Sequence, residues 1–272
     1  MEKQPVNKTQ NSGLRKYSGP ITEKISLGLM KVIPDITAND ITMTGLLTVV
    51  AGAALTIIPE SLLGFDFTPL AIALMTGGSS LDVLDGAMAR IQKTAGVDGA
   101  LLDLKADRWQ ETGLVLARIT TASMRKDPLG VAAAAMAGIT NPLPSWLRAQ
   151  VEEVDSVVPE SGAKPIGFLG TRAMRAVFGI GATGFSEISF PGTEQSIQPM
   201  LDLITAFSNI YTTFERAGIL QKAKKKELAI NSDPKIKELG ALKVKELKKF
   251  VALNTGIMLA AGTIGMINAL NQ

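Results

Sequence analysis

The chain has 272 residues, of which 46% are hydrophobic, and a formal net charge of +3. It contains no cysteine and no histidine, which excludes disulfides, thiol nucleophiles, zinc fingers, iron–sulfur clusters and imidazole catalysis. Acid–base or metal chemistry must therefore use Asp, Glu, Lys, Arg or Tyr side chains.

The chain begins with a polar lead over residues 1–36, without the apolar region of a signal peptide. Within this lead, residues 21–34 predict an amphipathic helix that lies on the membrane surface or caps a soluble protein. Six apolar stretches follow and are predicted to span a membrane: 41–58, 67–89, 101–124, 128–151, 168–185 and 197–213. A soluble all-α protein is the alternative, because charges interrupt several of these stretches.

The C-terminal region, residues 217–272, begins with a polar, Lys-rich segment and ends in an apolar run over 251–270. This run is long enough to span, and the sequence leaves open an extra span, an interfacial helix or a packing partner in a dimer. The expected fold is therefore all-α, a polytopic membrane bundle of six core spanning helices within residues 37–216, followed by a further C-terminal helix.

The distribution of charge supports a multi-pass protein of the cell membrane. If residue 1 is cytoplasmic, the outside loops 59–66 and 186–196 contain no Lys or Arg, whereas Arg125 and Lys126 are an exception. The inside segments carry Lys93, Arg148, Lys164 and the cluster Lys222, Lys224, Lys225 and Lys226. This positive-inside pattern predicts that the candidate site faces the cytoplasm. The lysine cluster is expected to contact anionic lipid headgroups.

Four aspartates within residues 81–111 form the main candidate site. Asp82 and Asp85 are three residues apart, and Asp103 and Asp107 are four apart, so each pair shares one helix face. Unpaired carboxylates in an apolar helix cost several kcal/mol, and two divalent cations would remove both that cost and the mutual repulsion. Hard oxygen ligands suit Mg²⁺ or Mn²⁺. Two such ions are a known device for displacement at phosphorus.

The whole pattern resembles the signature of the CDP-alcohol phosphatidyltransferase family. It reads Asp82-x-x-Asp85-Gly86-x-x-Ala89-Arg90, eight residues, Gly99, three residues, Asp103, three residues, Asp107. The resemblance implies a homodimer of six-helix membrane proteins. Such an enzyme moves a phosphatidyl group from CDP-diacylglycerol to a small alcohol and releases CMP.

The same resemblance implies roles for individual residues. The four aspartates hold two metal ions, and Asp107 also takes the proton of the acceptor hydroxyl. The residues implied for binding the CDP-lipid are Gly86, Ala89, Arg90 and Gly99, with Asn39 and Thr42 from a segment that resembles the family's loop before the first span.

A narrower resemblance, to the phosphatidylinositol phosphate synthases of bacteria, concerns the acceptor alcohol. The segment LDGAMAR, residues 84–90, and the pair Asp107-Arg108 are similar to theirs, which implies inositol phosphate as the acceptor. Arg148, Arg172 and Arg175 are then expected to bind its phosphate, although Gln150 stands where those enzymes have Arg. Glycerol 3-phosphate is the alternative acceptor.

Two interpretations compete with these roles. The three arginines can instead be positive-inside charge. In a different class, a cation transporter also uses intramembrane carboxylates, but carboxylates near helix ends, beside Gly86 and Arg90, suit a phosphate ligand better. Nothing in the sequence indicates a nucleic-acid partner.

Overall fold

The computed structural model describes residues 15–58, 60–94, 96–154, 177, 180–182, 196–226 and 234–271, and these form the all-α fold that the sequence predicts. In chain order the helices are α1 (Arg15–Val32), α2 (Ala38–Leu55), α3 (Glu60–Leu63), α4 (Thr68–Gln92), α5 (Val97–Met124), α6 (Pro128–Thr140), α7 (Leu143–Val154), α10 (Gln198–Lys226) and α11 (Pro234–Asn271). Most of the fifth predicted span, 168–185, lies outside the described residues.

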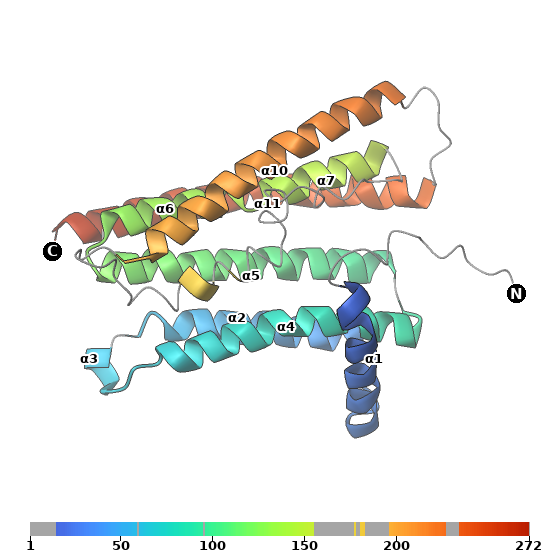
Figure 1. Ribbon diagram of the computed structural model, residues 1–272, viewed down its shortest axis with the longest axis horizontal. Coiled ribbons are helices and arrows are strands. Elements are labelled where there is room, and N and C mark those ends of the chain that lie inside the picture. The colour runs from blue at the N-terminus through green and yellow to red at the C-terminus, as the bar shows by residue number, and fades with distance from the viewer. Residues whose placement is uncertain are drawn as a thin grey trace, which may run out of the picture.

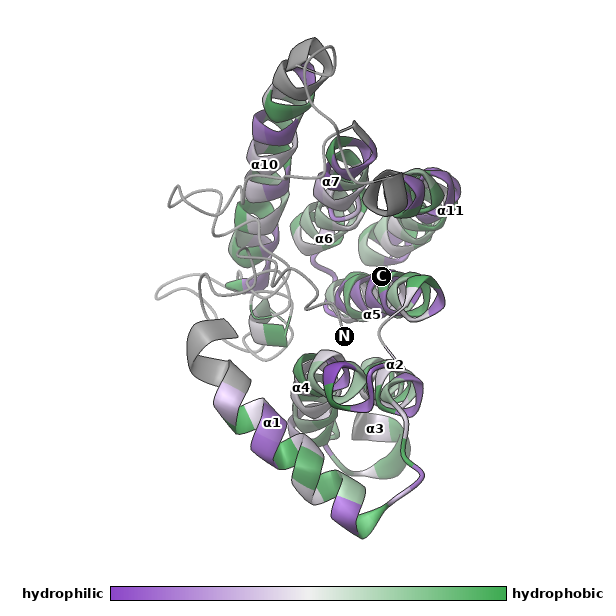
Figure 2. Ribbon diagram, turned by 90° about the vertical axis from the view of Figure 1, so that its right-hand side faces the viewer, coloured by the Kyte–Doolittle hydropathy of each residue, from purple (hydrophilic) through white to green (hydrophobic). Residues whose placement is uncertain are grey.

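Helix α5 lies at the centre of the bundle. It separates the pair α2 and α4 from the group α6, α7, α10 and α11 (Figure 1). Helix α2 packs against both α4 and α5, and α11 packs against α5, α6 and α7. Helix α1 packs against α4 and runs across the bundle (Figures 1 and 2). That crosswise direction suits the helix predicted to lie on the membrane surface.

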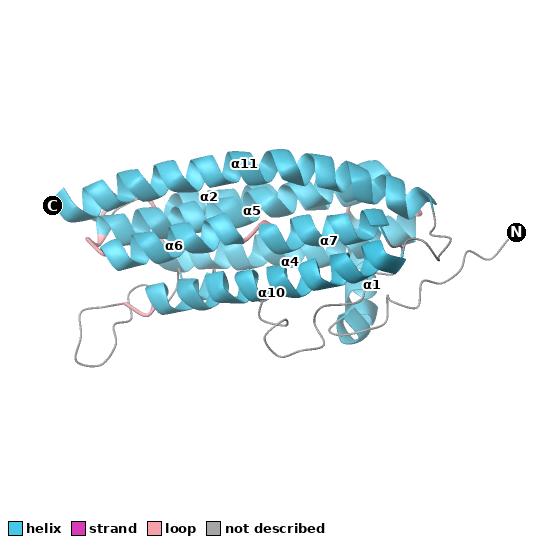
Figure 3. Cartoon of the chain, turned by 90° about the horizontal axis from the view of Figure 1, so that it is seen from above, coloured by secondary structure: helices cyan, strands magenta, loops and turns pink. Residues whose placement is uncertain are grey.

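The two ends of the bundle differ in the segments that they gather. One end has α1, the α4–α5 connection with Lys93, the last turns of α7 and α10 and the first turn of α11 (Figures 1 and 3). The other end has α3 and the α5–α6 connection. The first end therefore carries segments predicted to be cytoplasmic, and α3 belongs to a loop predicted to lie outside.

Two of the described helices are long and apolar enough to cross a membrane by length and composition. They are Ala38–Leu55, with a mean hydropathy of 1.3, and Glu238–Asn271, with 1.7. The fourth predicted span, 128–151, is divided in the structure into α6 and α7. Pro142 and Pro144 explain the division, because neither has an N–H for the helical hydrogen bond. The count of six spans stays a prediction.

Glycines set the close approach of α2 to α4. A Cβ on Gly78 would lie 2.7 Å from the carbonyl oxygen of Gly45 and 2.9 Å from the backbone nitrogen of Val49. Small residues of this kind let helix backbones meet in a membrane, where water does not drive helices together. This contact holds the two helices together one to two turns before the first Asp pair.

We expect Gly78→Ala to lower the thermal unfolding midpoint of the detergent-solubilised protein. Its Cβ would press on backbone atoms that cannot rotate away, and overpacking costs about 1–3 kcal/mol. Gly77→Ala is the matched control, because a Cβ there meets nothing within 4 Å. Equal midpoints for the two variants would contradict the close α2–α4 contact.

Candidate active site

Three helices carry the predicted metal ligands and CDP-lipid residues at the end of the bundle that contains α1. The first turns of α2 carry Asn39 and Thr42, α4 carries Asp82, Asp85, Gly86, Ala89 and Arg90, and α5 carries Gly99, Asp103 and Asp107.

Local interactions fix the ends of α2 and α4 beside this site. Helix α2 begins with a capping box in which the backbone nitrogen of Thr37 donates to Asp40 Oδ2 at 2.9 Å and the Asp40 nitrogen donates to Thr37 Oγ1 at 3.2 Å. Hydrogen bonds from Thr37 lower the pKa of the Asp40 carboxyl. Helix α4 ends where Lys93 turns left-handed, with φ of 56°. Gln92 Nε2 donates to the Ile36 carbonyl at 2.7 Å, which ties the end of α4 to the segment before α2.

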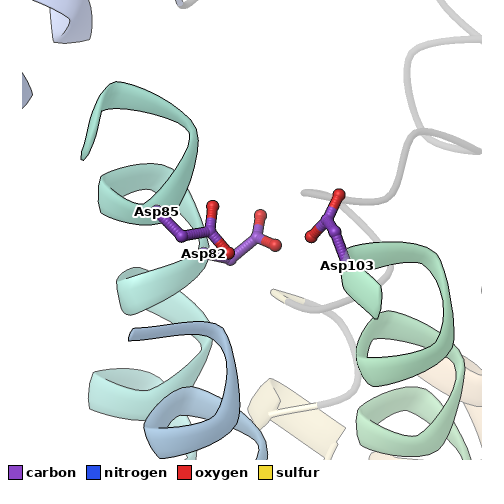
Figure 4. A group of neighbouring side chains, drawn as sticks. All are labelled: Asp82, Asp85 and Asp103. Carbon is purple, nitrogen blue, oxygen red and sulfur yellow. The ribbon is translucent and has the colours of Figure 1, made fainter. Parts of the chain in front are cut away.

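A cluster of three carboxylates forms the centre of the site. Asp82 and Asp85 of α4 and Asp103 of α5 each offer an oxygen, and these oxygens lie within 4.8 Å of one another. Figure 4 shows the three side chains pointing toward one another from the two helices. The structure therefore brings together three of the four predicted metal ligands.

The donor set fits a hard divalent cation. Mg²⁺ binds oxygen at about 2.0–2.1 Å, so opposite ligands of one octahedral ion lie about 4.2 Å apart. The three carboxylate oxygens lie within 4.8 Å of one another, a limit close to that separation. Carboxylates so close repel one another, and a cation among them turns the repulsion into attraction. These residues could hold such an ion with small side-chain adjustments.

Asp107, the fourth predicted ligand, lies one turn further along α5 and is buried. It is not one of the three clustered carboxylates. Its neighbour in sequence, Arg108, is also buried and forms an ion pair with Glu111, with Arg108 Nη1 2.6 Å from Glu111 Oε2. A buried charge pair thus follows Asp107 directly on α5.

Thr42 has a contact that the sequence did not predict. It was expected to touch the CDP-lipid, and its Oγ1 instead donates to Asp85 Oδ2 at 2.6 Å, in a buried position. This bond orients one carboxylate of the cluster from α2. The two residues are 43 positions apart, so only the packing of α2 on α4 reveals the contact.

The other residues predicted to bind the CDP-lipid lie around the cluster. A Cβ on Gly86 would lie 3.6 Å from Arg90 Nη1, so the Arg90 side chain turns back toward Gly86. A Cβ on Gly99 would lie 3.9 Å from Asn39 Oδ1, which places the start of α5 beside the start of α2. Ala89 packs against the apolar group formed by Ala38, Ile41 and Met88.

One predicted acceptor residue lies within the described part of the chain. Arg148 of α7 is 58% exposed, and its Nε is 3.0 Å from Glu152 Oε1. Glu152 also pairs with Lys243 of α11, at 2.9 Å. Burial raises the pKa of the Glu152 carboxyl, but the charges of Lys243 and Arg148 outweigh burial and leave that pKa below its ordinary value. Arg172 and Arg175 lie outside the described residues.

The fold and the carboxylate cluster define a helical membrane protein with a site suited to divalent metal. The chain belongs to the CDP-alcohol phosphatidyltransferase family, whose model matches residues 36–186. It is therefore a phosphatidyltransferase enzyme of phospholipid biosynthesis, as the aspartate pattern predicts. A search of the curated proteins gave no match.

Two solved structures have a similar fold, both of the phosphatidylinositol phosphate synthase PgsA1 of Mycobacterium tuberculosis. The first, with CDP-DAG bound, has a TM-score of 0.55 and 22% identity, and the match covers 74% of this chain and 94% of that one. The second, in complex with manganese and citrate, has a TM-score of 0.54 and 21% identity, and the match covers 74% of this chain and 88% of that one.

Proposed function

We propose that the enzyme transfers the phosphatidyl group of CDP-diacylglycerol to inositol phosphate and releases CMP. Glycerol 3-phosphate is the second candidate acceptor. The observation that carries the proposal is the cluster of Asp82, Asp85 and Asp103, with Arg90 at the adjacent turn of α4. The similar fold of a phosphatidylinositol phosphate synthase with CDP-DAG bound supports it.

We assign two Mg²⁺ or Mn²⁺ ions to Asp82, Asp85, Asp103 and Asp107. When bound, such ions neutralise charge on a diphosphate and make CMP a better leaving group. Thr42 holds the Asp85 carboxylate in place through its 2.6 Å hydrogen bond. Gly86 leaves room for the nucleotide beside α4, and Arg90 supplies a positive charge to its phosphates.

Asp107 is the proposed general base. It takes the proton from the acceptor hydroxyl as the hydroxyl oxygen attacks the lipid-side phosphorus and the bond to CMP breaks. The chain has no histidine, so a carboxylate at the reacting centre is the natural choice. By the family resemblance we also propose a homodimer.

The chemistry is proposed to take place at headgroup depth on the cytoplasmic side. On the outer face of α5, level with Asp103 and Asp107, Lys105 is 53% exposed and pairs with Glu246 of α11 at 3.1 Å. Trp109 packs edge-on against Phe250, with ring centroids 5.6 Å apart. Exposed charges beside a Trp are typical of a membrane–water interface.

Cysteine probes test this orientation, since the chain has no cysteine of its own. A membrane-impermeant thiol reagent added to intact cells should label Ser61→Cys, in α3, and leave Thr94→Cys, after α4, unlabelled. Both positions are exposed. Permeabilised cells provide the control, in which both probes should react. Labelling of Thr94→Cys in intact cells would contradict a cytoplasmic site.

The acceptor pocket is tested by removing single arginines. We expect Arg172→Ala or Arg175→Ala to raise the KM for the phosphorylated acceptor about 10- to 100-fold, because each charge-assisted contact to phosphate contributes roughly 1.5–3 kcal/mol. The KM for the CDP-lipid should change little, since that substrate is assigned to Gly86 and Arg90. An unchanged acceptor KM in both variants would mean that the acceptor phosphate binds elsewhere in the protein.

The activity itself is tested by incubating the purified protein with CDP-diacylglycerol, Mg²⁺ and a panel of alcohols while CMP release is measured. Inositol phosphate should give the highest rate, followed by glycerol 3-phosphate. If serine or free inositol gave a higher rate, the proposal of a phosphorylated acceptor would be wrong. If no alcohol increased CMP release, the proposed reaction would be wrong.

A further inference from the structure

The break between α6 and α7 leaves a backbone carbonyl in need of a donor. In a continuous helix the N–H of residue 142 would donate to the carbonyl of Gly138, but Pro142 has no N–H. Asn254 of α11 provides the donor instead, with its Nδ2 2.9 Å from the Gly138 oxygen. Asn254 is 2% exposed. A buried side chain of the C-terminal helix therefore completes the hydrogen bonding of the break.

The same amide group also contacts α5. Because the Gly138 carbonyl can only accept, the amide nitrogen of Asn254 faces it, and the amide oxygen faces the other way. That oxygen accepts a hydrogen bond from Thr112 Oγ1 at 2.9 Å. Thr112 is buried and lies little more than one turn after Asp107. Asn254 thus connects α11, α5 and the α6–α7 break through one side chain.

The surroundings of Asn254 are polar, tightly packed and close to the proposed catalytic segment. A small cavity beside it is lined in part by Arg108 and Glu111, the buried ion pair that follows Asp107 on α5. A Cβ on Gly138 would lie 2.5 Å from Met258 Sδ of α11 and 2.7 Å from a side-chain carbon of Val115 of α5. The three helices meet here with no room to slide, so a change at Asn254 is transmitted to α5.

We propose that Asn254 is a positioning residue for the transfer reaction. It fixes the register of α5, and therefore of Asp103 and Asp107, against the break between α6 and α7. Helix α11 lies beyond residues 36–186, which the family model matches, so the C-terminal segment of this chain contributes to the geometry of the site. The inference rests on the proposed function for the roles of Asp103 and Asp107.

The test replaces Asn254 in the full-length protein and follows metal binding. Loss of outer partners of metal ligands costs about 10- to 100-fold in metal affinity or activity. Asn254 lies further from the metal ligands than such partners do, so we expect a loss at the low end of this range. Asn254→Leu should bind Mn²⁺ about tenfold more weakly, as measured by electron paramagnetic resonance. The Mg²⁺ concentration for half-maximal CMP release should rise by a similar factor, and the KM for the CDP-lipid should stay nearly constant. In metal-free Asn254→Leu, the α5 amides near Asp107 should exchange hydrogen faster than in the metal-free wild-type protein.

Two further variants separate positioning from folding. Thr112→Val removes the hydroxyl that joins Asn254 to α5, together with the 2.9 Å contact of that hydroxyl to the Arg108 carbonyl of its own helix, and keeps the donor for Gly138. It should therefore weaken Mn²⁺ binding even if Asn254→Leu does not fold. Asn209→Leu is the matched control. Asn209 of α10 is equally buried and donates to Asn141 Oδ1 in the same break at 2.7 Å, but Asn141 is not on α5. It should lower stability without changing Mn²⁺ affinity.

Wild-type Mn²⁺ affinity in Thr112→Val, or an equal loss in Asn209→Leu, would overturn the role of Asn254. Failure of the proposed function gives a different result, in which the wild-type protein releases no CMP with any acceptor. Mn²⁺ binding and hydrogen exchange would still decide the role of Asn254 in that case, because neither measurement requires turnover.

Discussion

Replacing Asp103 by Asn should reduce CMP release by about a thousandfold or more while the protein stays folded. Asn keeps the size of the side chain but removes the negative charge from a cluster whose oxygens lie within 4.8 Å of one another. Metal ions contribute several kcal/mol to reactions at phosphorus, and each 1.36 kcal/mol is a factor of ten in rate. The same loss is expected for Asp82→Asn, Asp85→Asn and Asp107→Asn, and for the wild-type protein in excess chelator.

The control for this series is Asp98→Asn. Asp98 is on the first turn of α5, one turn before Asp103, and is exposed to solvent. Its replacement changes the net charge of the chain by the same amount and should leave the rate nearly unchanged. Full activity in Asp103→Asn, or in the presence of chelator, would exclude a metal-dependent reaction at this cluster. Loss of CMP release in Asp107→Asn alone would support Asp107 as the general base and would contradict a role for metal ions in the mechanism.

The carboxylate cluster could be predicted from sequence because its geometry is mostly local. Spacings of three and four residues put each Asp pair on one helix face, and the short connection between α4 and α5 brings Asp82, Asp85 and Asp103 together. The apolar stretches predicted the all-α fold for the same reason, since helical hydrogen bonds and side-chain faces repeat along a single segment.

The contacts that support the site could not be predicted in this way. Thr42 and Asp85 are 43 residues apart, and Thr112 and Asn254 are 142 apart. Such pairs depend on which helices become neighbours, and hydropathy does not encode that choice. The sequence left the run 251–270 open between a span, an interfacial helix and a dimer contact. The structure packs α11 within its own bundle, where Met258 joins the core formed with Val115 and Val131.

A buried ion pair provides the second large expected effect. Arg118 Nε of α5 lies 2.7 Å from Asp202 Oδ1 of α10, and the two side chains are only 2% and 1% exposed. Removing one member leaves the other charge buried without its partner, which costs about 3–5 kcal/mol. We therefore expect Arg118→Leu or Asp202→Leu to lower the thermal unfolding midpoint of the detergent-solubilised protein more than any surface substitution.

The double variant Arg118→Leu/Asp202→Leu distinguishes a cost of isolated charge from a cost of lost packing. If isolated charge dominates, the double variant should be more stable than either single variant, because no buried charge remains. The pair Lys105–Glu246 is the matched control: it also joins two helices, at 3.1 Å, but Lys105 is 53% exposed and Glu246 30%. Loss of such a surface pair costs about 0–1 kcal/mol, so Lys105→Leu should unfold close to the wild-type temperature.

A double variant less stable than both single variants would mean that the two side chains stabilise the fold through their packing rather than through their charges. Because α5 also carries Asp103 and Asp107, the Arg118 contact would then anchor the catalytic helix to α10 by packing alone.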